Sequence, residues 1–294
     1  MKAQVAIDAG EVNFSGGHVL FVEGGADSLD VSVLSSVLNI TVKPLGPSAY
    51  VRSVAQAMHP AFPNYYFLVD RDRLDDDEVE TLWQKFPMTD TPNLLAWRKK
   101  EVESYFLDPE YVMQSKYFAK GKSETDVQRF LVRYSRPYVF MEAANRVIVS
   151  IREQLKKKWI EKFSDKTEFP DAKSALEKLL SVPEFAFQLN KVKALVDVEN
   201  LTLKFQAELR RLLGEGDALT WGQGRWLDLM PAKAMMRSLL ASPLFKVVGR
   251  DKKPLSGMDK IDVIVKELLT PDKKLPPDFQ ELERLMKMQL QGTV

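Results

Sequence analysis

The sequence contains no cysteine and only two histidines, His18 and His59, among its 294 residues. Without cysteine the chain cannot form disulfides, thiolate zinc sites or a cysteine nucleophile. Two histidines so far apart also disfavour a histidine-rich metal site. Any metal ion in this protein must therefore be held mainly by oxygen ligands.

The chain also lacks an excess of charge of one sign and a long apolar run. Lys plus Arg number 42 and Asp plus Glu 41, so the formal net charge of +1 gives no global basic field for nucleic acid. An acidic pocket with basic rims is still compatible with this balance. No stretch approaches the ~20 apolar residues of a membrane helix, and the start lacks the apolar core of a secretory signal. We therefore expect a globular cytoplasmic protein that does not enter a membrane.

The stretch NYYFLVDRD at 64–72 combines a strand signal with acidic residues. The apolar run 65–69 is rich in β formers and predicts a strand buried on both faces of a parallel sheet. Asp70 and Asp72 follow at its carboxyl end, where open α/β sheets bind ligands. Residues two apart share one side of an extended segment, so both carboxylates can face one ion. A solvated turn with arginine counter-charges is the alternative interpretation.

A second pair of acids follows the first predicted strand, at 18–22. Glu23 lies at the carboxyl end of that strand, and Asp27 begins a helix predicted over 28–38. Both carboxylates therefore belong to the same edge of the sheet as Asp70. The alternatives are a solvated turn for Glu23 and, for Asp27, an N-terminal helix cap, which is the simpler interpretation of that residue alone.

The order of elements predicts an α/β protein with a mainly parallel sheet flanked by helices, because strands alternate with helices at βαβ spacing. Further strands are predicted at 40–43 and 94–97 and a helix over 48–58, while the acids 75–80 open another helix. From Asp108 the pattern becomes helical. We also predict a returning strand at 225–229, a helix opening at 230–233, and helices at 259–269 and 277–290.

Four motifs, in this order, resemble the carboxy-terminal catalytic region of the OLD (overcoming lysogenization defect) family of nucleases, which has the Toprim fold. They are VEGGAD at 22–27, LVDRD at 68–72, WRKKEVESYFLDPE at 97–110 and MPAK at 230–233. Ser104 stands where the family has asparagine, and Ala232 where it has glycine. The similarity covers residues from about 18 to 240.

The resemblance implies a Toprim-type, mainly parallel sheet flanked by helices, with an inserted all-helical domain. Residues 1–107 and 218–250 would form the Toprim catalytic domain, 108–217 the inserted helical domain, and 251–294 a C-terminal helical segment.

The implied function is a metal-dependent DNA endonuclease that nicks or cuts both strands by two-metal phosphodiester hydrolysis. The cofactors would be two Mg²⁺ or Mn²⁺ ions, which prefer carboxylates and water. The implied metal ligands are Glu23, Asp27, Asp70, Asp72 and either Glu101 or Glu103, a choice that the sequence leaves open. The implied catalytic residues are Glu23, Asp70, Asp72 and Lys233, of which Lys233 would place its charge on the scissile phosphate. Candidates for positioning the DNA backbone are Arg71, Arg98, Lys99 and Lys100.

DNA is therefore the expected partner, and a homodimer is a candidate assembly. OLD proteins carry an amino-terminal ABC-type ATPase region, and this chain has no P-loop. The sequence is therefore either an isolated catalytic region or a short relative of the family. The resemblance implies the former more readily, with the ATPase partner region absent from this chain. The alternatives are a non-catalytic nucleic-acid-binding Toprim module, another Toprim enzyme of topoisomerase or primase type, and a small-molecule phosphohydrolase.

Overall fold

The computed structural model describes residues 17–59, 61–72, 74–87, 91–154, 163–182, 195–249 and 252–291. The chain divides into two compact units, and each is described by itself. The first contains the residues up to Arg98 and those from Leu269 on, and the second runs from Lys99 to Leu268. Among the described residues, no helix has both the length and the apolar character needed to cross a membrane.

The first unit is built on a four-stranded sheet with the order β2-β1-β3-β4. Its strands are β1 (Val19–Val22), β2 (Thr41–Pro44), β3 (Tyr65–Val69) and β4 (Leu94–Ala96). All neighbouring strands are parallel, and Val22 pairs with Pro44 on one side and Leu68 on the other. The predicted parallel α/β sheet is confirmed.

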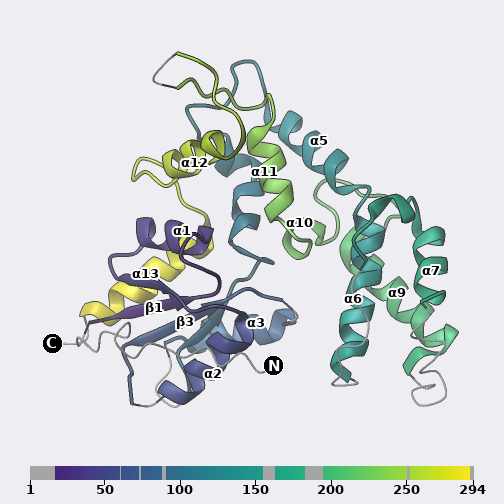
Figure 1. The fold of residues 1–294 in the computed structure, drawn as a ribbon, viewed down its shortest axis with the longest axis horizontal. Helices are drawn as coiled ribbons and strands as arrows, with labels where there is room; N and C mark the ends of the chain where they lie inside the picture. The colour runs from purple at the N-terminus through teal and green to yellow at the C-terminus, as the bar shows by residue number, and fades with distance from the viewer. Residues whose placement is uncertain are drawn as a thin grey trace, which may run out of the picture. The chain divides into compact units, whose positions relative to one another are not determined.

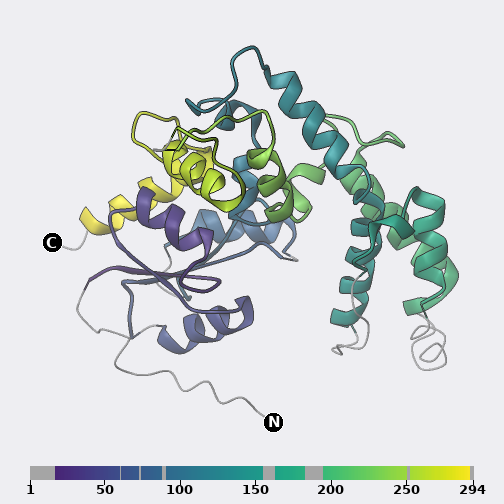
Figure 2. The ribbon, with the colours of Figure 1, turned by 45° about the horizontal axis from the view of Figure 1, so that its top comes forward.

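Helices cover both faces of this sheet. They are α1 (Leu29–Val37), α2 (Ser48–Met58), α3 (Asp76–Lys85) and α13 (Pro277–Gln291). In both ribbon views α1 and α13 lie on one face and α2 on the opposite face (Figures 1 and 2). Side chains alternate along β1 and β3, so that Phe21 and Phe67 pack against Val51 and Ala55 of α2. This core fixes the strand ends that carry the acidic residues.

The acidic segment 75–80 is confirmed as the start of a helix, α3. Asp75 accepts a hydrogen bond from the backbone N–H of Glu78 at 2.8 Å, and Glu78 accepts one from the N–H of Asp75 at 2.9 Å. This capping box satisfies two backbone donors at the helix N-terminus. These acids therefore stabilise α3, as expected.

The second unit is helical in the residues that the structure describes. The 3₁₀ turns are η1 (Val102–Leu107) and η2 (Lys166–Glu168), and the α-helices are α4 (Pro109–Val112), α5 (Glu124–Ser135), α6 (Val139–Gln154), α7 (Ala172–Leu180), α9 (Val198–Leu213), α10 (Trp226–Leu229), α11 (Lys233–Ala241) and α12 (Gly257–Leu268). Helices α6, α7 and α9 pack against one another, whereas α11 packs against η1, α5 and α12 (Figure 1).

One predicted strand is wrong. Residues 225–229 contain the helix α10, in which Trp226 and Leu229 are both buried. A spacing of three residues between buried side chains fits a helical face and not the alternation of a strand.

The unit boundaries also differ from the predicted domains. Helices α10 and α11 belong to the second unit, and the predicted C-terminal segment is divided between the two units. Lys260 holds α12 in the second unit, because its ammonium binds the carbonyls of Ala241 and Ser242 at 2.9 and 2.8 Å. Phe279 of α13 instead packs on Trp97, with ring centroids 5.5 Å apart.

Arg98 joins three parts of the first unit. Its guanidinium binds Glu80 of α3 at 2.7 Å, and Asp278 and Glu281 of α13 at 3.1 and 2.8 Å. It also lies over the ring of Trp83, 4.1 Å from the centroid. These contacts connect the end of β4 to both helices.

We predict that Arg98→Ala lowers the free energy of unfolding by about 1.5–3 kcal/mol, because it removes hydrogen bonds to charged groups and leaves like charges together. Urea unfolding measures this change. The control is Lys287→Ala on α13, which removes an exposed pair with Glu283 and should cost less than about 1 kcal/mol. Equal losses in the two variants would contradict the role given to Arg98.

Candidate functional site

Glu23 and Asp70 lie at the carboxyl ends of the adjacent strands β1 and β3. The Glu23 carboxylate accepts a hydrogen bond from the backbone N–H of Asp70 at 3.2 Å. The backbone N–H of Glu23 donates to the carbonyl of Leu68 at 3.3 Å. The two strand ends are therefore bound to each other where the acids begin, as the sequence predicts for this edge of the sheet.

The loop after β1 is fixed by a close approach of two glycines. Gly24 and Gly46 exchange backbone hydrogen bonds of 2.9 and 3.0 Å. Gly24 has a φ of +104°, and a Cβ atom there would lie 2.8 Å from Cβ of Ser28. Glycine is therefore required at this position. The paired loops bring Glu23 close to the N-terminus of α2.

The electrostatic environment of Glu23 favours its neutral form. Burial raises the pKa of its carboxyl, and the negative charge of Asp72 raises it further. Hydrogen bonds from the backbone of Asp70 and Ser48, and the charge of Arg52, act in the opposite direction without reversing the shift. Crowded carboxylates of this kind are stabilised by a bound cation.

The other predicted acids of this edge differ in exposure. Oδ1 of Asp70 is buried, whereas Asp72 is exposed and has a φ of +45°, which is uncommon for a residue other than glycine. Asp27 is also exposed. The helix cap is Ser28, whose hydroxyl accepts from Val31 N–H, so the cap interpretation of Asp27 is wrong. Its role as a metal ligand stays a prediction.

Arg71 and Arg98 both bind other groups of the first unit. Arg71 is only 2% exposed, and its guanidinium donates to the carbonyls of Leu74 and Arg98 at 3.1 and 2.6 Å and to the carboxylate of Asp76. The guanidinium of Arg98 is bound by carboxylates of α3 and α13, as described above. Both arginines therefore connect parts of the first unit, and their contact with DNA stays a prediction.

In the second unit, Glu101 is bound to the start of α11. One oxygen of its carboxylate accepts from the backbone N–H of Ala232 and from that of Lys233, the latter at 2.7 Å. A negative charge at a helix N-terminus is stabilising, because the first N–H groups have no partner within the helix. Glu101 therefore has a structural task, independent of any role as a metal ligand.

Glu103 lies in the 3₁₀ turn η1 and not in an extended segment, so it does not share one side of a strand with Glu101. It is 7% exposed. Burial raises the pKa of its carboxyl, the charge of Glu101 raises it further, and the charges of Lys233 and Arg237 partly oppose the shift. Acids and exposed cations thus meet at the start of α11.

The two predicted lysines of this segment lie close to Asp228. The ammonium of Lys99 pairs with the Asp228 carboxylate at 3.5 Å, and the backbone N–H of Lys100 donates to the Asp228 carbonyl at 2.6 Å. With these contacts both lysines stay partly exposed. Their contact with DNA stays a prediction.

Sequence reasoning missed Arg52 and Arg237. The charge of Arg52 acts to lower the pKa of Glu23, and the charge of Arg237 acts to lower that of Glu103. Arg52 lies four residues after Ser48 on α2, and its Nε donates to the Ser48 hydroxyl at 3.4 Å. Arg237 lies four residues after Lys233 on α11. Residues four apart share a helix face, so a search for cations one turn after each loop would have found both.

The acids provide the right ligand type for magnesium or manganese, but not a formed site. Carboxylate oxygens are the ligands that these hard ions prefer. Within the parts of the chain that the structure describes, no three His, Cys, Asp or Glu side chains are grouped so that they could hold a metal ion. An ion bound by Glu23, Asp70 and Asp72 together therefore requires a shift of at least one carboxylate.

Comparison with known proteins adds no assignment. The sequence matches no model of a known protein family, and no curated protein matches it. The interpretation of the site therefore depends on its own residues.

The raised pKa of Glu23 predicts a pH dependence of stability. Between the ordinary value of 4.5 and the raised folded-state value, the folded protein binds more protons than the unfolded chain. The Glu23 contribution to stability is therefore lost as pH rises through this window. Glu23→Gln removes that loss and keeps an acceptor for Asp70 N–H. Above the window we therefore expect the variant to have a higher free energy of unfolding than wild type, by at most about 1 kcal/mol, because solvent screens this group.

Urea unfolding of wild type and Glu23→Gln between pH 3 and pH 8 measures the effect. The free energies of unfolding of the two proteins should differ little when the pH is well below the ordinary pKa of Glu23, and should diverge as pH rises. The control is Asp27→Asn, an exposed acid in the same loop. A Glu23→Gln variant that is less stable than wild type at pH 7 would contradict the assigned electrostatics.

The contacts of Glu101 predict a second effect on stability. Glu101→Ala should lower the free energy of unfolding by about 1–2 kcal/mol, because the first N–H groups of α11 lose their acceptor. Glu101→Gln should cost less, since its amide oxygen still accepts. Thermal unfolding measures both variants, with Glu110→Ala as an exposed control in the same unit. If Glu101→Ala is as stable as the control, Glu101 does not cap α11.

Proposed function

We propose that this protein is a divalent-metal-dependent DNA endonuclease with a Toprim-type catalytic region like that of the OLD nucleases. The observation that carries the proposal is the acidic edge of the sheet, where Glu23 and Asp70 are bound together at the ends of β1 and β3 and Asp72 raises the pKa of Glu23. A parallel sheet with acids at this edge is the arrangement that the resemblance leads us to expect.

In this proposal Glu23, Asp70 and Asp72 hold Mg²⁺ or Mn²⁺, and Asp27 is a further ligand. The resemblance also implies a ligand role for either Glu101 or Glu103, which belong to the second unit. Bound divalent ions would activate a water molecule and neutralise the charge that develops on the phosphate. The backbone N–H of Asp70 orients the Glu23 carboxylate, and the N–H of Ser48 favours its charged form. These contacts pre-organise one carboxylate of the proposed ligand set.

The cations of the site have separate proposed roles. Lys233 would lie against the scissile phosphate or leaving group, as the resemblance implies, and Lys99 and Lys100 would position the DNA backbone. The exposure of Lys233 at the first residue of α11 supports its role, because its ammonium is open to a phosphate. An ATPase region outside this chain and a homodimer remain part of the proposal.

A non-catalytic nucleic-acid-binding module is the second candidate. One observation favours it: the described acids form no group of three that could hold a metal ion. Such a module would bind DNA in a salt-dependent manner and cleave nothing.

Cleavage of supercoiled plasmid separates the two candidates. We expect nicked or linear product with Mg²⁺ or Mn²⁺ and none with excess EDTA. Asp70→Asn and Glu23→Gln should each reduce the rate by at least about 100-fold, because each removes a charge that would hold the ion. Gel analysis of product against time gives the rates.

The matched control is Asp77→Asn, which removes an exposed carboxylate of α3 outside the proposed site. It should cleave at the wild-type rate. Cleavage in EDTA, or full activity in both site variants, would contradict the metal-dependent mechanism. Salt-dependent DNA binding without cleavage in either metal would favour the binding module.

A further inference from the structure

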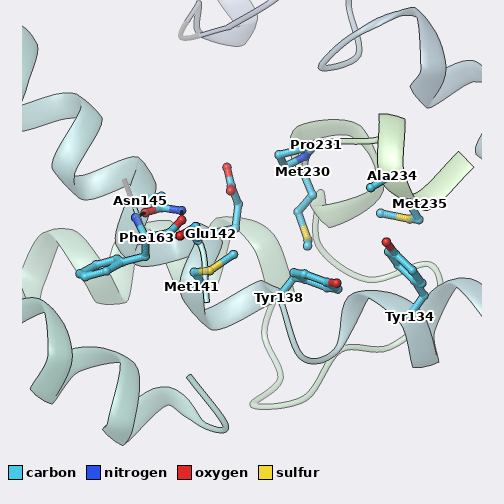
Figure 3. A pocket seen from close by; sticks show the side chains of 11 residues that line it. Tyr134, Tyr138, Met141, Glu142, Asn145, Phe163, Met230, Pro231, Ala234 and Met235 are labelled. Atoms are coloured by element: carbon cyan, nitrogen blue, oxygen red, sulfur yellow. Dashed lines mark hydrogen bonds between the residues drawn. The ribbon is translucent and has the colours of Figure 1, made fainter. Parts of the chain in front are cut away.

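The second unit contains a cavity of about 250 Å³ that the proposed chemistry does not use. It lies between the end of α5, the first part of α6 and the segment that opens α11. Figure 3 shows the rings of Tyr134 and Tyr138 facing the thioethers of Met230 and Met235 across it. The walls are therefore mainly aromatic and thioether groups, which pack well against a flat ring.

One wall is the end of a row of stacked aromatic rings. The ring centroids of Tyr134 and Tyr138 lie 5.5 Å apart with an interplanar angle of 24°, and Phe130 continues the row at 6.3 Å from Tyr134. The ammonium of Lys166 lies 4.6 Å from the centroid of the Tyr138 ring and 3.0 Å from its hydroxyl. A stacked aromatic wall with an adjacent cation is the arrangement that binds bases of single-stranded nucleic acid.

The size and polarity of the cavity fit one nucleobase. An apolar cavity of about 150 Å³ holds benzene, so the larger volume here has room for a pyrimidine or purine ring. Glu142 adds its carboxylate to the lining. A carboxylate accepts hydrogen bonds from the exocyclic amino groups of bases.

The position of the cavity in the chain connects it with the proposed phosphate contact. Pro231 and Ala234 line the cavity, and Lys233 lies between them in the sequence. The same short segment therefore offers an apolar surface to a ring and a cation to a phosphate, which are the two parts of a nucleotide.

We infer that this cavity binds the base of an unpaired nucleotide in the DNA substrate. The inference rests on the proposed function, because it assumes that DNA is the ligand of this protein. It adds a preference for single-stranded, mismatched or distorted DNA, in which a base leaves the stack at low cost.

Binding of oligonucleotides in EDTA tests the inference without cleavage. The probes are a duplex whose only unpaired nucleotide carries 2-aminopurine, and the same duplex with an abasic site at that position. Wild type should quench the 2-aminopurine fluorescence and bind the base-bearing duplex about 5- to 150-fold more tightly, since stacking of one base contributes about 1–3 kcal/mol. Tyr138→Leu should lose both effects. Ala234→Phe should also lose them, because it fills the cavity from an exposed position of α11.

The matched control is Tyr117→Leu. Tyr117 is another partly buried tyrosine of this unit with a lysine ammonium, that of Lys116, 5.1 Å from its ring centroid, but it does not line the cavity. It should quench the 2-aminopurine fluorescence and discriminate between the probes like wild type. Equal affinity for the two duplexes, or quenching that persists in both Tyr138→Leu and Ala234→Phe, would overturn the inference. Base discrimination in a protein that cleaves no DNA would refute the nuclease but support this site.

Discussion

The hydrogen bond from the backbone of Asp70 to the side chain of Glu23 is the contact on which the candidate site depends. It exists because β1 and β3 are neighbours in a parallel sheet whose register places Val22 opposite Leu68. The acids that follow these strands must then lie side by side. Apolar burial in the sheet therefore sets the positions of the charges, and the proposed cation would offset the cost of holding those charges together.

The sheet and most helices of the first unit could be predicted from the sequence, because their signals are local. The run 65–69 has the composition of a buried strand and is one, and the acids from Asp75 begin a helix as their pattern indicates. The edge position of Glu23 and Asp70 follows from the same reasoning. Periodicity and topology are enough for this part of the site.

What could not be predicted depends on contacts between distant segments. Nothing around Arg71 or Arg98 in the sequence shows that carbonyls and carboxylates of other segments surround their guanidinium groups. The division of residues 251–294 between two units could not be predicted for the same reason, because the sequence of an amphipathic helix does not show which element its apolar face packs against. The strand prediction for 225–229 was wrong for a local reason, because a short apolar run fits both a strand and a helical turn.

The proposed nucleotide contacts of the second unit gather at the start of α11. Glu101 fixes the start of α11, from which Lys233 extends into solvent and Ala234 lines the cavity. Arg237 follows one turn later and opposes the raised pKa of Glu103. The first turns of α11 thus carry two cations and part of the cavity wall, and Glu101 caps this helix start from a distant segment of the same unit.

The central claim is that the acidic edge of the sheet binds a divalent cation. The most direct measurement is titration with Mn²⁺, with paramagnetic broadening read from the backbone amide signals of the first unit. The account predicts that the amides of Gly24, Arg71 and Asp72 broaden first and that Asp70→Asn abolishes this effect. Broadening that begins elsewhere, or that is unchanged in the variant, would contradict the account.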